Sequence, residues 1–313
     1  MKAVVRLLAA TIHSWREDKA PRLGAALAYY TIFSIPPLLM LLIGMASLVF
    51  GRDAVEGRIV GTIQGLIGAG GAAAIQDMLR NAHASGHGLI ATVIGFVTLL
   101  LGASGVVSSL KDALNTIWEI EPKPGRGILA FLKDYIFSMS LALAGGFLLL
   151  VSLAVSAALA ALGDYLGRVL PGGAGVWGTV NVVLSVLVIG FLFAVLFKYL
   201  PSARVAWKDV LLGGLFTSVL FTVGETLIGL YLGRTKVGSA FGAAGSLVVI
   251  LVWVYYSSMI LFFGAEFTQA YARLYGSRIV PDRDARPVAD EQREQQGIPR
   301  RQGASRPFAP GVR

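Results

Sequence analysis

One carboxylic acid lies inside a long apolar stretch, where its position suggests chemistry rather than solvation. The stretch GGLFTSVLFTVGETLIGLYLG, 213–233, is long enough to cross a bilayer as one helix and carries Glu225 slightly past its middle. A charged carboxylate at such a depth costs about 2.5–3.5 kcal/mol on insertion scales. The presence of an acid at this depth therefore predicts a functional role. Thr222 and Thr226 lie within one helical turn of Glu225.

Further polar side chains lie in other apolar stretches, and two interpretations of them stay open. If their helix faces converge, they line a polar cavity in which Glu225 is a protonatable acid. If they do not, each hydroxyl bonds its own helix backbone and Glu225 makes a structural hydrogen bond between helices. The candidate cavity or substrate residues are Glu225, Tyr29, Tyr30, Ser34, Pro36, Pro37, Asn181, Thr222 and Thr226.

A second acid, Glu266, lies near the end of the last apolar stretch, in LFFGAEFTQAY. At that depth a carboxylate is close enough to the lipid headgroups to pair with a basic side chain. We therefore expect an interfacial ion pair between Glu266 and one of Lys198, Arg204 or Lys208.

Enzyme chemistry finds little support in the residues. The chain has no cysteine and three histidines, of which His83 and His87 are spaced i, i+4 but lack an adjacent acid to complete a zinc site. There is no phosphate-binding P-loop, no nucleophile elbow and no aromatic-basic repeat for nucleic acid. We expect no enzymatic activity, no metal, no cofactor and no nucleic-acid partner.

The elements that must position these residues are transmembrane helices. Of the 313 residues, 55% are apolar and 14% are charged, and the mean hydropathy is +0.70. The apolar runs are continuous rather than alternating, which favours helices over the strands of a barrel. The sequence therefore predicts an all-α polytopic bundle with six spans, near 27–50, 89–110, 136–162, 177–197, 210–232 and 246–268.

The charges predict the orientation of this bundle. One set of loops, together with both termini, holds 21 of the 27 Lys and Arg residues, so both termini are predicted to be cytoplasmic. Residues 1–26 form a basic amphipathic stretch suited to anionic headgroups, and 27–272 hold the six spans. Residues 51–88 form an external helical loop, and 273–313 form a basic tail whose polar, proline-containing composition predicts disorder.

The segment 102–125 is predicted to change from span to amphipathic helix. Val107, Leu110, Leu114 and Ile117 share one helical face, and the sequence EPKPG then ends the helix.

Four stretches of the chain resemble a family. They are LGAALAYYTIFSIPPLL (23–39), LKDALNTIW (110–118), LPSARVAWKDVLLGGLF (200–216) and FGAAGSLVVILVWVYYSSMILFFGAE (241–266), and together they resemble the YihY/BrkB membrane proteins. The resemblance covers roughly 20–275 and implies a bacterial inner-membrane protein with six helices and no settled activity. It assigns Tyr29, Tyr30, Pro37 and Gly264 to Glu266 as motif positions. The family's former ribonuclease label is regarded as an error, and some members have been linked to serum resistance and to lipid or lipopolysaccharide precursors.

Three functional hypotheses follow. The first is a transporter or flippase-like protein for a lipid or small polar envelope-related substrate, motivated by the expected kink at Pro36 and Pro37 and by the polar residues near Glu225. The second is a scaffold that recruits envelope partners, and the third is a membrane hydrolase or ribonuclease. Membrane lipids are the expected partners, and the sequence leaves an oligomer open.

Overall fold

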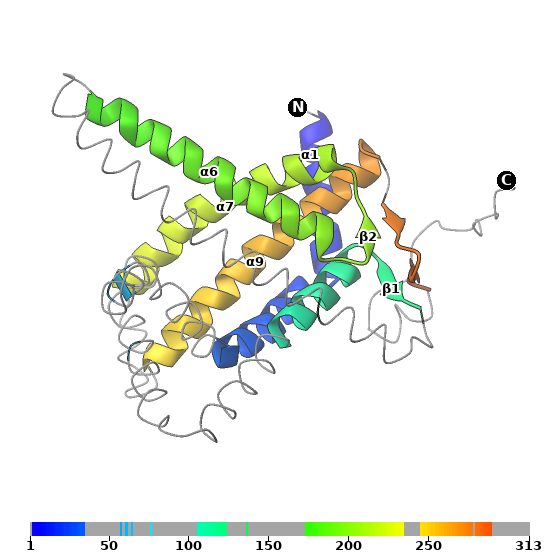
Figure 1. The fold of residues 1–313 in the computed structure, drawn as a ribbon, viewed down its shortest axis with the longest axis horizontal. Helices are drawn as coiled ribbons and strands as arrows, with labels where there is room; N and C mark the ends of the chain where they lie inside the picture. The colour runs from blue at the N-terminus through cyan, green and yellow to red at the C-terminus, as the bar shows by residue number, and fades with distance from the viewer. Residues whose placement is uncertain are drawn as a thin grey trace, which may run out of the picture.

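The computed structural model of the chain describes residues 2–34, 57, 60, 61, 64, 76, 105–123, 136, 173–234, 245–277 and 279–289. These residues are mostly helical, with short strands gathered at one side of the molecule (Figure 1). The prediction of a largely helical protein is confirmed at this level.

Three long helices form the largest described part of the bundle. They are α6 (Gly173–Tyr199), α7 (Trp207–Arg234) and α9 (Gly245–Leu274). The segments in them that are long and apolar enough to cross a membrane are Val182–Tyr199, Trp207–Tyr231 and Leu247–Leu274. These coincide with the last three predicted spans. The predicted spans 27–50, 89–110 and 136–162 lie mostly outside the described residues, so the total of six remains a prediction.

Helix α7 packs against both α6 and α9, and small residues allow these contacts. Gly190 of α6 lies against Gly214 of α7, so the two backbones approach closely. On its outer face α7 exposes Val219, Val223 and Leu227 at a spacing of four residues. Such an apolar outer stripe suits contact with lipid chains.

The N-terminal helix α1 (Lys2–Glu17) is amphipathic, as predicted. Its buried Leu7 packs against Phe267 and Ala270 of α9. A short turn follows in which Lys19 has a positive φ of 51°, and a second helix occupies residues 20–34. This second helix runs through the predicted boundary between residues 26 and 27.

Helical residues 105–117 confirm the predicted amphipathic segment. Leu114 and Ile117 are fully buried, and Val107 and Leu110 pack against the same apolar cluster. The prediction that EPKPG ends the helix is wrong, because the helix already ends at Ile117. Glu119, with a φ of 56°, then turns the chain into a strand.

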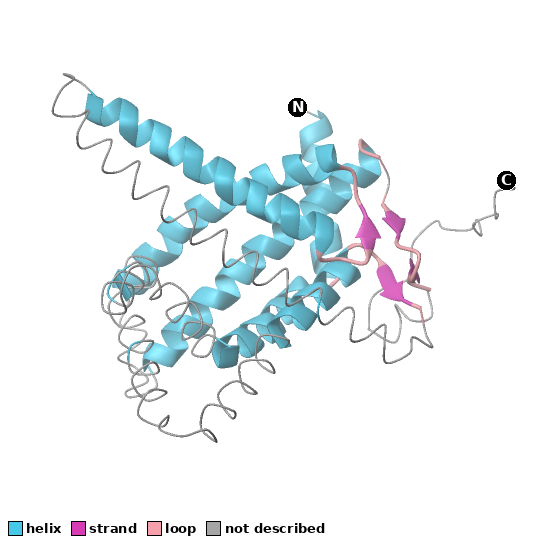
Figure 2. Cartoon of the chain, in the orientation of Figure 1, coloured by secondary structure: helices cyan, strands magenta, loops and turns pink. Residues whose placement is uncertain are grey.

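Four short strands connect the segments that follow helix 105–117, α6 and α9. They are β1 (Ile120–Pro122), β2 (Ala203–Arg204), β3 (Val280–Pro281) and β4 (Ala285–Pro287). Strand β1 pairs antiparallel with β4, and β2 pairs antiparallel with β3 (Figure 2). We call this part of the molecule the strand end.

The predicted disorder of 273–313 is wrong for residues 273–277 and 279–289. Helix α9 continues to Leu274, and β3 and β4 follow it. Ala285 and Val288 are buried there, so this part of the tail has apolar anchors that its polar composition hid. The prolines of β3 and β4 are tolerated because each lies in a two-stranded ladder, where an edge position needs no donor. Residues 290–313 lie outside the described part.

The main apolar core also lies at the strand end. It joins Trp118 and Phe197, whose ring centroids are 5.8 Å apart, with Phe262 of α9, with the loop residue Val205 and with Ala285 of β4. Helices, loops and the C-terminal strands therefore share one core.

Candidate groove between residues 20–34 and 105–117

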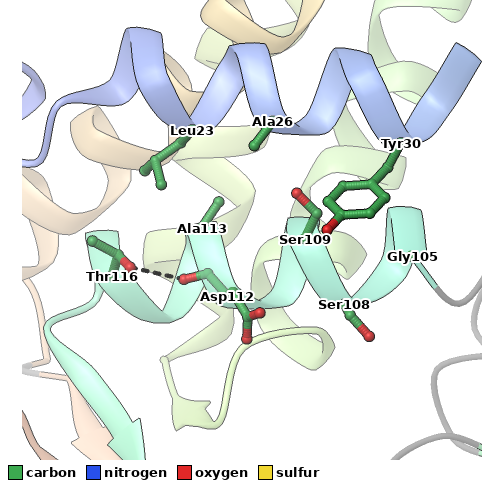
Figure 3. Close-up of a pocket in the computed structure, with 9 residues that line it drawn as sticks. All are labelled: Leu23, Ala26, Tyr30, Gly105, Ser108, Ser109, Asp112, Ala113 and Thr116. Atoms are coloured by element: carbon green, nitrogen blue, oxygen red, sulfur yellow. Dashed lines mark hydrogen bonds between the residues drawn. The ribbon is translucent and has the colours of Figure 1, made fainter. Parts of the chain in front are cut away.

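A groove of about 310 Å³ lies between helix 20–34 and helix 105–117 (Figure 3). Each helix contributes residues at helical spacing. The lining residues are Leu23, Ala26, Tyr30, Gly105, Ser108, Ser109, Asp112, Ala113 and Thr116. Several of these lining side chains are small, and they leave space between the two helices, which run side by side in Figure 3.

Two stripes on helix 105–117 shape the groove. Gly105, Ser109 and Ala113 recur every four residues, and Figure 3 shows Ser109 and Ala113 pointing toward helix 20–34. Ser108, Asp112 and Thr116 form a neighbouring polar stripe with the same spacing. In Figure 3 the side chains of Ser108 and Asp112 project away from helix 20–34. The groove therefore has a floor of small residues and a polar edge.

The Tyr30 ring closes the groove at the end away from the strands. It lies so close to Gly105 that a Cβ atom added at this glycine would be 2.9 Å from the Tyr30 Cδ1 atom. Position 105 needs glycine for this close approach. The ring of Tyr30 also meets that of Tyr29 edge-on at 5.7 Å, and Tyr29 meets Phe33 at 5.1 Å. All three aromatic side chains are exposed among the described residues.

Asp112 gives the polar edge its charge. Burial of the carboxyl by surrounding protein raises its pKa above the ordinary aspartate value, and the nearby Lys111 charge opposes this rise. The side chain nevertheless keeps solvent exposure at the open side of the groove. The Thr116 hydroxyl donates to the Asp112 backbone oxygen at 2.9 Å. None of the described lining residues is basic, so the groove offers hydroxyls and one acid.

The residues predicted around Glu225 are not part of this groove. Glu225 is half-buried on α7, Thr222 donates to the Ser218 carbonyl oxygen at 2.9 Å, and Thr226 donates to that of Thr222 at 3.1 Å. Ser34 likewise donates to the Tyr30 carbonyl oxygen at 2.9 Å. These hydroxyls bond the backbones of their own helices. The choice between the two interpretations also involves helix faces outside the described residues, so it stays a prediction.

Of the other predicted site residues, some lie at the groove and some are not described by the structure. Tyr30 lines the groove, and Tyr29 lies beside it. Asn181 belongs to α6, but its side chain is not among those described, and Pro36 and Pro37 lie outside the described residues.

The expected ion pair of Glu266 is a prediction that the structure contradicts. Glu266 is fully buried, and no hydrogen-bond donor among the described residues reaches either carboxyl oxygen. Arg204 instead pairs with Asp282 at 3.0 Å, Lys198 donates to the Val205 carbonyl oxygen, and Lys208 is exposed.

The neighbours of Glu266 explain why that prediction failed. The charged groups that act on it are Asp18, Glu119 and Glu17, which come from two distant parts of the chain. Its surroundings are therefore acidic rather than basic. Among the described residues, no group of three or more His, Cys, Asp or Glu side chains is arranged to hold a metal ion.

The groove residues of helix 105–117 were not identified from the sequence as a site. Their signal is the pair of four-residue repeats, Gly105-Ser109-Ala113 and Ser108-Asp112-Thr116. The first repeat predicts close helix packing and the second a polar edge. Neither repeat indicates which helix lies opposite.

The apolar helices and the groove near their strand end define a helical membrane protein. The chain matches the family described as Virulence factor BrkB over residues 11–289, and it belongs to that family.

Curated relatives carry the name UPF0761 membrane protein. The chain is 31% identical over 273 residues to the one from Pseudomonas paraeruginosa (strain DSM 24068 / PA7), covering 86% of this chain and 64% of that protein. It is 29% identical over 253 residues to the one from Azotobacter vinelandii (strain DJ / ATCC BAA-1303), covering 80% of this chain and 59% of that protein. The chain thus spans a little under two thirds of these relatives' length. No solved structure matches it.

Proposed function

We propose that this protein binds amphiphilic molecules in the groove between helices 20–34 and 105–117 and moves them at the membrane, as a transporter or flippase-like protein. The observation that carries this proposal is the groove's two-part lining: hydroxyls and Asp112 along one edge, and the exposed aromatic ring of Tyr30 at one end. The exposed rings of Tyr29 and Phe33 continue from Tyr30 outside the lining. A molecule with a polar head and an apolar chain matches both parts.

The position of the groove along the helices supports this proposal. Helix 105–117 leads directly into β1, so Thr116 lies at the strand end and Gly105 lies further along the helix. We place the strand end at the cytoplasmic face of a bacterial inner membrane, since the loops on that side hold most of the Lys and Arg residues. A bound headgroup would then lie near Asp112 at headgroup depth, with its chain directed past Tyr30 into the bilayer.

The charge of the groove favours one class of headgroup. Asp112 is the charged residue among the described lining residues. A headgroup with an amine or ammonium group would gain a charge-assisted contact there. A headgroup bearing only negative charge would be repelled. The proposal involves binding and movement without a covalent step.

Helix α1 fits the same placement. It exposes Arg6 and Arg16 together with Val4 and Val5, while Leu7 holds it against α9. A surface helix with apolar and basic exposed residues suits the boundary of a bilayer with anionic lipids.

The test compares two variants that each introduce a leucine, one inside the groove and one on the outer face of α7. Gly105→Leu places a side chain where the Tyr30 ring now lies, and Val219→Leu enlarges an exposed position of α7. Purified proteins in vesicles would be assayed for binding and transbilayer movement of acyl-labelled phosphatidylethanolamine and phosphatidylglycerol. We expect Gly105→Leu to weaken binding of the first lipid about tenfold, equivalent to about 1.4 kcal/mol, and Val219→Leu to bind normally. If folded Gly105→Leu protein binds and moves both lipids like the wild type, the groove is not the site.

A further inference from the structure

The C-terminal residues 279–289, which we call the strap, lie across two loops that are far apart in sequence. Strand β3 pairs with β2 after α6, and β4 pairs with β1 after helix 105–117. Further backbone hydrogen bonds extend both contacts: Asp282 donates to Ser202 at 3.1 Å, and Val288 donates to Glu119 at 3.0 Å. Figure 2 shows the four strands together at one side of the helices.

Ion pairs at the surface reinforce each contact. The Arg204 Nε atom is 3.0 Å from the Asp282 Oδ1 atom, and the Arg286 Nε atom is 2.5 Å from the Glu121 Oε1 atom. Lys123 donates from its Nζ atom to the Arg283 carbonyl oxygen at 2.8 Å. Arginine and aspartate of the first pair are well exposed, so solvent competes with this contact. Short ladders held in part by exposed ion pairs can open without unfolding the helices.

The strap is connected to the wall of the groove. The Ser202 backbone, which accepts from Asp282, donates in turn to the Oδ1 atom of Asn115 at 2.8 Å. Asn115 is buried on helix 105–117, next to the groove residue Thr116. The second contact is more direct, because β1 continues the chain of that helix. Both halves of the strap therefore restrain one wall of the groove.

The beginning of the strap is fixed separately. The Ser277 backbone donates to the Asp209 Oδ2 atom at 3.0 Å, and a Cβ atom at Gly276 would lie 2.6 Å from the Asp209 Oδ1 atom. This anchor on α7 involves neither β1 nor β2. The ladders can thus separate while the segment stays attached to the helices.

We propose that the strap regulates the groove: paired with β1 and β2 it holds helix 105–117 against helix 20–34, and its release lets this wall move and admits the amphiphile. This inference rests on the proposed function of the groove. The strap acts by positioning helix 105–117 and does not touch the bound amphiphile, since none of the described lining residues belongs to it.

The absence of cysteine from the chain makes a direct test possible. Glu121 and Arg286 are partners in the β1–β4 register, so Glu121→Cys with Arg286→Cys gives a pair that can be joined by oxidation. We would measure the rate at which acyl-labelled phosphatidylethanolamine enters the protein, and hydrogen exchange of residues 105–117, before and after oxidation. The reduced form of the same sample controls for folding.

We expect oxidation to slow lipid entry by about tenfold and to slow exchange in 105–117, with reduction restoring both. The opposite change is Asp282→Arg, which should open the β2–β3 contact and speed both processes, and Arg204→Asp added to it should restore the pair with its charges exchanged. If oxidised and reduced proteins show the same exchange in 105–117, the strap proposal is overturned. If exchange responds but the lipid never binds, the strap restrains the helix and the proposed function of the groove is the part that fails.

Discussion

Thr217 of α7 lies directly against Gly264 of α9, and the contact has a counterpart in which Thr268 of α9 lies against Gly213 of α7. Each threonine hydroxyl donates to its own helix: Thr217 to Gly213 and Thr268 to Gly264, both at 2.7 Å. The hydroxyls are thereby satisfied in an apolar environment, and the glycines let the helices approach. This reciprocal contact sets the separation of α7 and α9.

The first prediction is that Gly264→Ala destabilises the protein. A Cβ atom at position 264 would overlap the side chain of Thr217, which is fully buried. We expect a cost of about 1–3 kcal/mol, measured as a lower thermal midpoint in detergent. Gly264→Ala combined with Thr217→Ala should recover only part of the loss, because the Cβ atom of residue 217 would still lie 2.7 Å from the new Cβ. A single variant as stable as the wild type would show that the helices can separate without penalty.

The second prediction concerns pH and Asp112, whose raised pKa keeps the carboxyl neutral to a higher pH than an ordinary aspartate. Below this raised pKa an ammonium headgroup meets no charge, and above it the carboxylate attracts the headgroup. Binding of phosphatidylethanolamine should therefore strengthen as pH rises through the raised pKa of Asp112. Titrating the binding from pH 4 to pH 8, about the range over which a perturbed aspartate ionises, checks this.

The matched variant for that titration is Asp112→Asn, which keeps the shape of the side chain and removes the charge. Its binding should be weak and should not change over the range in which the wild type changes. The stability of the folded protein changes in the opposite direction. Because Asp112 binds its proton more tightly in the folded state, the free energy of unfolding falls as pH rises from the pKa of Asp112 in the unfolded chain to its raised pKa in the folded protein. A pH profile shared by both proteins would assign the titration to another group.

The third prediction is that Asn115→Ala loosens the link between helix 105–117 and the loop after α6. The buried Ser202 amide would lose its acceptor, which costs about 1–3 kcal/mol. Hydrogen exchange at the Ser202 amide should rise well above the wild-type rate. Ser108→Ala on the exposed edge of the same helix is the control and should leave that exchange unchanged.

The sequence was sufficient for elements whose pattern is local. Continuous apolar runs predicted spans at 177–197, 210–232 and 246–268, and the helices found there are Gly173–Tyr199, Trp207–Arg234 and Gly245–Leu274. The apolar face of 105–117 was equally visible, because the burial of Leu114 and Ile117 follows from helical periodicity.

Contacts between distant segments could not be predicted in the same way. Arg204 was expected to meet Glu266, but its partner Asp282 is 78 residues further along the chain. Periodicity indicates which face of a helix is buried but not what covers it. For the same reason the strap, whose polar composition is typical of a disordered tail, became recognisable only through its pairing with β1 and β2.

The fourth prediction returns to Glu225, which is half-buried within the candidate span Trp207–Tyr231. Since Thr222 and Thr226 bond their own helix, neither hydroxyl donates to it. Glu225→Gln keeps hydrogen bonding and removes the acid, whereas Glu225→Leu removes both. If the acid takes part in lipid movement, Gln should fold normally and lose transport. A Gln variant with wild-type transport, beside a Leu variant that is less stable, would assign Glu225 a structural hydrogen bond instead.

The fifth prediction concerns Glu266, which is fully buried and surrounded by acids rather than by the expected base. Asp18 is the acidic group that acts on Glu266 most strongly, and two like charges repel each other at a buried site. An amide at position 266 carries no charge and removes this repulsion. We therefore expect Glu266→Gln to match or exceed wild-type stability, while Glu266→Ala, which leaves a cavity, loses about 2–4 kcal/mol. Thermal midpoints in detergent at pH values from about 5 to about 8 measure both variants over the range of common stability maxima. If Gln proves as damaging as Ala, the carboxylic acid itself is required at this position.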